Sequence, residues 1–178
     1  AFAGSKLKVF EIPAGANIQV IPANAFKNSV NLETVIIPAT IGGQPVVAIS
    51  GYSFYRCDYI TSIVVPNSVT RFDGSAFSWC VSLESVVFSN NMTSIGDWAF
   101  DNCHALKSVT IPVGITNISD YVFNNCFFNA PGKASTEPTK TAADGTVTQN
   151  PGVRAVDVTS GRATIVANNC GDRSISLK

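Results

Sequence analysis

The sequence of 178 residues is poor in charge and in the residues that carry most enzyme chemistry. It contains a single histidine, His104, and only 13% of its residues are charged, against roughly 25% in an ordinary soluble domain. Twelve basic and twelve acidic side chains cancel to a formal net charge of zero. Because nucleic acids and anionic membranes attract proteins that carry excess positive charge, we expect neither as a partner.

Long apolar runs are missing as well. No segment approaches the roughly 18–20 apolar residues that cross a bilayer, so we expect no membrane insertion. Leucine is scarce, with 5 residues against 20 valines and 15 isoleucines. Because β-branched side chains pack well on pleated surfaces, this composition predicts a chain built mainly of strands. Serine, threonine and asparagine supply 47 of the 178 residues, a composition more typical of extracellular surface proteins than of cytosolic enzymes.

A 23-residue repeat fills the middle of the chain. Four columns of apolar residues keep this step, and a cysteine follows three residues after each phenylalanine. The columns are Phe54, Phe77, Phe100 and Phe123; Cys57, Cys80, Cys103 and Cys126; Leu32, Ile60, Leu83 and Leu106; and Val35, Ile63, Val86 and Val109. An earlier copy has Ser29 in place of cysteine and stands 28 residues before the next, because the segment 41–49 inserts five residues.

Such a unit is too small to bury its own apolar face, so neighbouring units must stack into a solenoid. Residues 107–112 alternate apolar and polar side chains, which predicts a half-buried strand that Pro112 ends. Between Ile95 and Cys103 the apolar residues are spaced by four, five and eight, which is close to one face of a short helical turn. The sequence thus predicts an α/β leucine-rich-repeat solenoid. Its right-handed coils of about 23 residues would carry a parallel β-sheet on one side and short helical turns on the other.

The consensus LxSVxIPxxVTSIGDxAFxxC resembles the BspA-type (Treponema-type) leucine-rich repeats of bacterial and protozoan surface proteins. The segment IPATIGGQPVVAIS is similar to that family's usual lead-in to a full coil. The resemblance covers about residues 18–126. It implies a secreted or surface-anchored protein that acts in adhesion and protein binding and has no catalytic residues.

The repeat boundaries predict three parts: an N-terminal cap strand within 1–17, a solenoid of about five coils over 18–128, and a tail over 129–178. The tail begins with a linker-like stretch. It continues as a β-hairpin, because 153–158 and 163–167 alternate apolar and polar residues around Thr-Ser-Gly. We expect the tail to be ordered by packing either on its own solenoid or on a neighbouring subunit.

The aligned cysteines predict an inert buried column. Stacking places the four sulfurs in a row, which is unsuited to tetrahedral zinc, and parallel Cβ vectors are too far apart for disulfides. Cys170 lies outside the column and could pair or stay free. His104 adjoins Cys103, but adjacent residues on a turn point in different directions. We therefore expect no enzyme activity, no metal and no cofactor.

Two further patterns have ordinary explanations. Aspartates at 73, 97, 101 and 120 form an interrupted, offset column, which favours a solvated polar face over a calcium site. The triplets beginning at Asn91 and Asn117 match the N-glycosylation sequon. They are either acceptor sites in a secreted eukaryotic protein or chance matches.

Two surfaces are candidates for interaction. Period-2 alternation points one largely apolar column outward from the sheet, and aromatic residues lie on the turn side outside the phenylalanine and cysteine columns. The sheet column is Ile36, Val64, Val87 and Thr110, and the aromatic residues are Tyr52, Tyr55, Trp79, Trp98 and Tyr121. The tail could instead fold back and cover the sheet column.

The resulting hypothesis is a non-catalytic, extracellular module that binds a protein or host-surface ligand in adhesion at a cell surface. The alternative is a structural subunit of an extracellular filament or layer. It would bind copies of itself through the sheet face, the open coil ends and the C-terminal tail.

Overall fold

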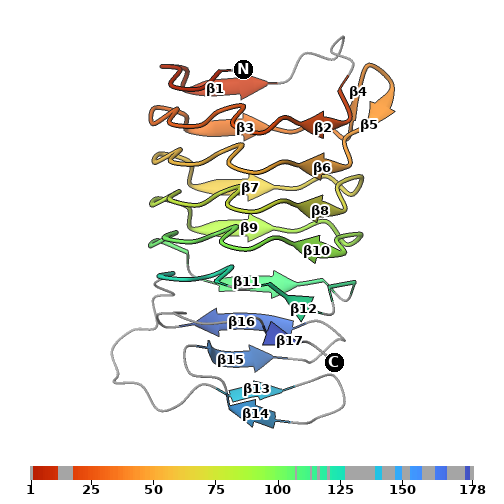
Figure 1. The fold of residues 1–178 in the computed structure, drawn as a ribbon, viewed down its shortest axis with the longest axis vertical. Helices are drawn as coiled ribbons and strands as arrows, with labels where there is room; N and C mark the ends of the chain where they lie inside the picture. Colours follow the sequence, from red (N-terminus) through yellow and green to blue (C-terminus); the bar gives the residue numbers. More distant parts are fainter. Residues whose placement is uncertain are drawn as a thin grey trace.

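The computed structural model describes residues 2–11, 18–106, 108–112, 114–115, 117–119 and 121–126, and the backbone of five further strands in the tail. Coils of the repeat stack along one axis into a solenoid (Figure 1). Cys170 and most of the stretch expected to be linker-like lie outside the described residues.

Each coil contributes one strand to a first sheet. These strands are β1 (Val9–Glu11), β3 (Thr34–Ile36), β7 (Ser62–Val64), β9 (Ser85–Val87) and β11 (Ser108–Ile111). β1 pairs with β3, β7 with β9 and β9 with β11, all parallel. The pairing keeps equivalent repeat positions side by side, which confirms the predicted parallel sheet.

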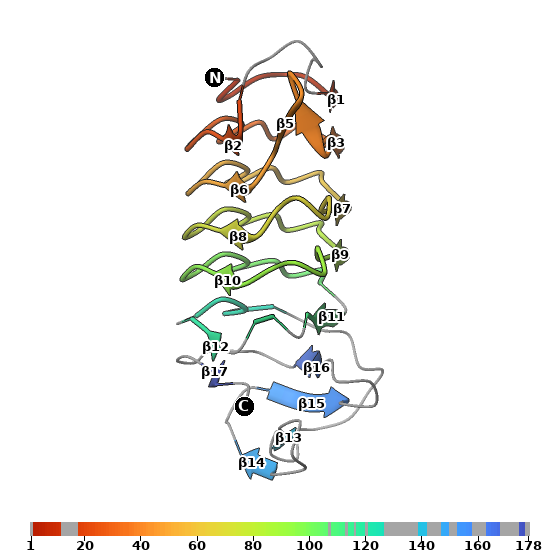
Figure 2. The same cartoon turned by 90° about the vertical axis from the view of Figure 1, so that its right-hand side faces the viewer.

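A second parallel sheet runs along the opposite side of the solenoid (Figure 2). Its ladder joins β2 (Val20–Ile21), β6 (Ala48–Ile49), β8 (Arg71–Phe72) and β10 (Ser94–Ile95), and β12 (Asn117–Ile118) follows in the next coil. The sequence pattern did not predict this sheet, because two-residue strands are too short to show an alternation.

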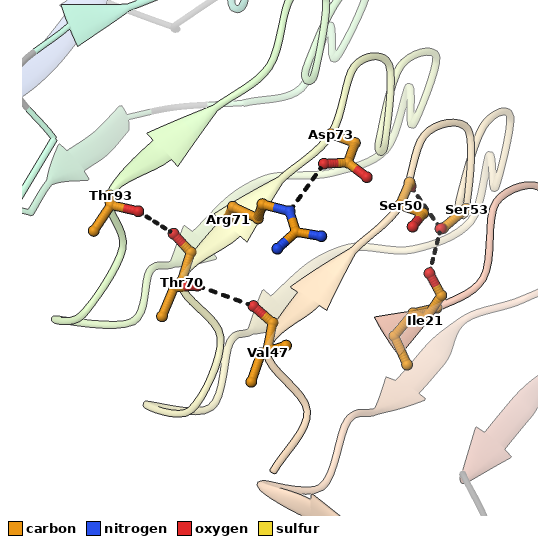
Figure 3. Close-up of polar contacts among 8 residues, drawn as sticks. All are labelled: Ile21, Val47, Ser50, Ser53, Thr70, Arg71, Asp73 and Thr93. Atoms are coloured by element: carbon orange, nitrogen blue, oxygen red, sulfur yellow. Dashed lines mark hydrogen bonds and ion pairs between the residues drawn. The ribbon is translucent and has the colours of Figure 1, made fainter. Parts of the chain in front are cut away.

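Threonines reinforce the second sheet. Both the backbone N–H and the hydroxyl of Thr70 donate to the carbonyl of Val47, at 2.9 and 3.2 Å. Thr93 repeats the pair on the carbonyl of Thr70, at 2.8 and 3.1 Å (Figure 3). These two coils therefore each hold the previous one with two donors at a single carbonyl.

The prediction of short helical turns is wrong, since no helix occurs among the described residues. The turn segment of each coil instead contains two residues, four apart, with positive φ, such as Tyr52 (57°) and Arg56 (55°). These left-handed conformations interrupt a right-handed helix. The N–H of Phe54 between them donates to the carbonyl of Ala76 in the next coil, at 2.8 Å. The α/β class is therefore corrected to an all-β solenoid.

Stacked phenylalanine rings form the centre of the core. Phe54 and Phe77 are fully buried, their centroids lie 5.1 Å apart and their planes differ by 4°. Phe77 and Phe100 stack at 5.3 Å, and Phe100 and Phe123 at 5.6 Å. The predicted buried column is confirmed.

The column extends further toward the N-terminus than the repeat columns indicated. The ring of Phe2 stacks on Phe26 at 5.6 Å, and the hydroxyl of Ser29 donates to the Phe2 carbonyl at 2.8 Å. The signal was present in the sequence, because AFAGS at residues 1–5 matches AFKNS at residues 25–29.

Strands from the tail pair with the last coil. β15 (Val153–Asp157) and β16 (Ala163–Ala167) are antiparallel, and β16 pairs with β11 in the first sheet. β17 (Ile175–Ser176) pairs with β12. β13 (Thr139–Thr141) and β14 (Val147–Gln149) pair within the stretch expected to be linker-like. The last coil is thereby extended on both sheets.

The phenylalanine stack generates a stability prediction. Phe100 contacts rings on both sides, so Phe100→Ala leaves a cavity that neighbouring coils cannot fill. We expect a loss of roughly 3–5 kcal/mol in the free energy of unfolding, measured by urea denaturation. Ser85→Ala, at an exposed position, is the control and should change stability by less than about 0.5 kcal/mol. A loss below about 1 kcal/mol for Phe100→Ala would contradict the packing.

Candidate interaction surfaces

An apolar strip lies on the outer face of the first sheet. It consists of Ile36, Val64 and Val87, whose side chains are 46%, 66% and 57% exposed. Val64 and Val87 are register partners on adjacent strands. Glu11 on β1 is the register partner of Ile36, and Thr110 on β11 is exposed at the other end. The strip is therefore bounded by a polar residue at each end, and the described tail does not cover it.

The alternation within each strand puts these side chains outside. In β7 and β9 the middle residue points inward, with Ile63 1% and Val86 7% exposed, while the residues on either side are exposed. An exposed sheet position is usually filled by threonine or a charged residue, so two valines and an isoleucine in line form a surface typical of contact sites.

The first sheet is interrupted along the strip. β3 pairs only with β1, and β7 ends the ladder that continues through β9 and β11. A groove of about 370 Å³ lies between β3 and β7, lined among others by Glu33, Ile36, Thr61 and Val64. A second groove, of about 240 Å³, lies beside Val87 between β9 and β11. The apolar strip thus contains hollows as well as exposed methyl groups.

Three of the predicted aromatic residues are well exposed on the turn segments: Tyr52 at 45%, Trp79 at 38% and Trp98 at 40%. Tyr55 and Tyr121 are half-buried. Tyr59, at 60%, is more exposed than any of them and was not singled out by the repeat pattern.

Contacts within the chain occupy most of these rings. Trp98 stacks on Tyr121 with centroids 4.2 Å apart. Tyr52 meets Tyr55 edge-on at 5.6 Å, and the Lys27 ammonium lies 5.2 and 5.5 Å from their two centroids. The aromatic residues therefore join neighbouring coils to one another, and the sheet face is the stronger candidate for binding.

The cysteine column is buried, as predicted, and its four thiols are free. Each thiol donates to the carbonyl of the phenylalanine one coil back, for example Cys80 to Phe54 at 3.2 Å and Cys126 to Phe100 at 3.1 Å. Ser29 makes the same hydrogen bond to Phe2 at the start of the column. In every coil where this bond is described, the position thus holds a small side chain with one donor.

Burial keeps these thiols protonated. It raises the pKa of Cys57 from 9.0 to about 12 and raises the pKa of Cys80 and Cys103 well above 9.0. A thiolate is the reactive form of cysteine. The Cys103 thiol donates to the carbonyl of Phe77, while the ring of His104 lies near Trp79 and the amide oxygen of Asn102. The adjacent cysteine and histidine therefore do not form a nucleophile–base pair.

One acidic residue differs from expectation. Asp101 is only 8% exposed, so it does not belong to a solvated face. The Asn124 amide donates to its carboxylate at 2.7 Å and the Ser78 hydroxyl at 3.4 Å. Ser78 lies one coil before Asp101 and Asn124 one coil after it. Their hydrogen bonds replace those that water would give an exposed carboxylate.

Across the described residues, no three histidine, cysteine or acidic side chains gather as a metal site would need. The same part of the chain holds no helix with the length and apolarity of a membrane span.

Comparison with known proteins gives consistent results. A family model described as a BspA type leucine rich repeat region matches residues 1–129 with six copies. The crystal structure of a leucine-rich repeat protein from T. pallidum is similar, with 32% identity and a TM-score of 0.64 over 71% of this chain and 56% of that one. A leucine-rich repeat protein from Bacteroides ovatus shares 28% identity, with a TM-score of 0.54 over 69% of this chain and 36% of that one. The chain thus spans little more than half of the first structure and about a third of the second. Among curated proteins, none matches the sequence.

The thiol column predicts a dependence of stability on pH. Because the folded pKa of Cys80 lies above its unfolded value, the unfolded chain loses the thiol proton first. The contribution of the thiol to stability is therefore complete below pH 9 and is lost as pH rises. At pH 10 the loss is about 1 kcal/mol for one such thiol.

Cys80→Ser isolates this effect, because serine keeps a donor and does not titrate. Between pH 7 and pH 10 the unfolding free energy of wild type should fall by about 1 kcal/mol relative to Cys80→Ser, measured by urea denaturation. Parallel pH profiles for the two proteins would contradict protonation by burial.

Proposed function

The chain belongs to the BspA-type leucine-rich repeat family, and from this premise we propose that it is a non-catalytic binding module whose ligand-binding surface is the outer face of the first sheet. The observation that carries the proposal is the apolar strip of Ile36, Val64 and Val87, each roughly half exposed or more. A strip of this kind is costly to leave in water and gains free energy when a partner covers it.

The proposal includes a location and a class of partner. Low charge, abundant serine, threonine and asparagine, and the family membership support an extracellular or cell-surface protein that acts in adhesion. The partner would be a protein or host-surface ligand that contributes an apolar patch. The buried, protonated thiols and the separation of Cys103 from His104 support the absence of catalysis.

Self-assembly is the second candidate, and the same strip favours it. A second copy of the chain offers an identical apolar strip, so two sheet faces could cover each other in a two-fold arrangement. The oligomeric state of the free protein separates this candidate from adhesion to another surface.

The strip is tested by changing its polarity without changing its shape. Val64→Thr with Val87→Thr keeps β-branched residues on the strands and removes apolar contact area. If about 100 Å² is lost from an interface, binding weakens by about 2.5 kcal/mol, close to a hundredfold. Val64→Lys with Val87→Lys should be more severe, because charges would be buried without a partner.

The measurements are light scattering after size exclusion and binding to immobilised extracellular-matrix proteins. The control is Ser94→Lys with Gln19→Lys, which adds the same charge at exposed positions on or beside the second sheet. Loss of self-association in the strip variants selects assembly, and loss of binding by a monomer selects adhesion. If circular dichroism shows an intact fold and neither property changes, the sheet face is not the functional surface.

A further inference from the structure

The break between β3 and β7 is a feature that the apolar strip alone does not explain. Every other pair of successive strands from β1 to β11 is joined in a parallel ladder. Within the described residues, no backbone hydrogen bond joins β3 to β7. The two strands therefore present facing edges whose N–H and C=O groups lack the partners that the regular repeat would supply.

The five inserted residues account for the break. They form a hairpin of β4 (Thr40–Ile41) and β5 (Gln44–Pro45), which turns through Gly42 and Gly43 at φ of 58° and 77°. This hairpin pairs only with itself and lies between β3 and β6 in the chain (Figure 1). The missing ladder therefore falls in the one coil that the added length enlarges.

Next to the insertion, the core and the second sheet keep their regular spacing between coils. Phe26 and Phe54, which flank the insertion, stack at 5.1 Å with planes 4° apart, as closely as Phe54 and Phe77. β2 and β6 pair in register on the second sheet. The solenoid is thus opened on the first sheet alone, as a wedge, while the core and the opposite sheet hold it together.

The break is narrower than a further strand requires. Cα atoms of β3 and β7 lie within 8 Å of each other, and a strand between them would hold its neighbours about 9.6 Å apart, twice the usual spacing. Insertion therefore has to open the first sheet by at least about 2 Å. The opening falls on the β4–β5 hairpin, because no ladder ties it to another coil. Two exposed side-chain hydrogen bonds, from Gln19 to Gln44 at 3.0 Å and from Ser68 to the carbonyl of Ala39 at 2.9 Å, have to give way.

Two carboxylates lie at or beside the break, and one of them is already paired with a lysine. Glu33 is the one charged residue lining the groove, and its carboxylate meets Lys8 at 3.0 Å in an exposed pair. Glu11, on the neighbouring strand beside Ile36, is also exposed. A segment with a basic residue near an apolar one would place the cation near these carboxylates and the apolar side chain beside Ile36 and Val64.

We propose that the break binds an extended segment of a partner protein, which enters as an additional strand between β3 and β7. Backbone hydrogen bonds to the two free edges supply affinity, and alternate side chains supply specificity. The inference rests on the proposed function of the sheet face and names the form of its ligand: a strand-forming segment with an apolar residue and a neighbouring lysine or arginine.

A peptide copied from the chain's own repeat serves as the probe. Residues 105–112, ALKSVTIP, occupy a first-sheet position in a later coil and carry Lys107 where β3 is preceded by Glu33. The labelled peptide should bind the full chain at one site by fluorescence anisotropy. In the peptide, Val109→Pro removes a central backbone donor and should weaken binding at least tenfold. Lys107→Glu should weaken it severalfold at low salt and less at high salt.

The matched variant closes the break. Deleting residues 42–46 restores the 23-residue step. Ile41 and Val46 are both fully buried, so Ile41 can fill the position that Val46 leaves. The deletion should abolish peptide binding. Gln44→Ala keeps the hairpin and should leave peptide binding unchanged.

Each outcome decides the proposal. Absence of peptide binding to wild type, equal binding to the deletion variant, or equal binding of the Val109→Pro peptide overturns it. If the deletion variant does not fold, hydrogen exchange on the unmodified chain decides. Peptide-dependent protection of β3 and β7 supports insertion, and protection confined to β1 or β15, the outer edge strands of the first sheet, overturns it.

The deletion also separates this inference from the proposed function. It leaves Ile36, Val64 and Val87 in place, so binding that uses only the exposed strip persists in the deletion variant and is lost in Val64→Lys with Val87→Lys. If Val64→Lys with Val87→Lys leaves ligand binding unchanged while the wild type binds the peptide, the proposed surface is refuted and the break remains a separate site.

Discussion

Every coil of this solenoid depends on backbone hydrogen bonds to the coils on either side. No 23-residue unit can bury its own apolar face, so these bonds and the rings stacked between them form the structure. In the turn segments, N–H groups such as those of Phe54 and Phe77 reach carbonyls of the next coil rather than closing a helical turn. Left-handed residues such as Tyr52 and Trp98 set that direction. The conformation of each turn is therefore dictated by stacking.

Hydrogen bonding between coils also explains which side chains occupy the inside of the solenoid. A small donor is needed below each phenylalanine carbonyl, and both the Cys80 thiol and the Ser29 hydroxyl meet the need. Thr70 and Thr93 add donors to carbonyls on the second sheet. The cysteines that invite a metal or catalytic interpretation are part of this hydrogen bonding, and their burial holds them protonated.

Because three separate sides of each coil are bonded, one side can be changed while the others persist. The five-residue insertion interrupts the first sheet between β3 and β7, yet Phe26 and Phe54 remain stacked across it. An insertion into a structure held on one side alone would instead separate the coils. This arrangement lets the repeat carry a groove beside the apolar strip without losing its core.

The repeat columns by themselves determined the solenoid, because a fixed 23-residue step forces equivalent residues into line. The same alignment predicted the buried phenylalanines and cysteines, the parallel first sheet and the outward direction of Val64 and Val87. Only the tertiary structure decided the rest. The spacing of apolar residues between Ile95 and Cys103 suits a helix and a stack of turns equally, and the choice lies in hydrogen bonds between residues 22 or 23 apart. The break beside Ile36 was equally hidden. A five-residue insertion is visible in the sequence, but which side of the coil it opens depends on which neighbouring contacts are strong enough to stay closed.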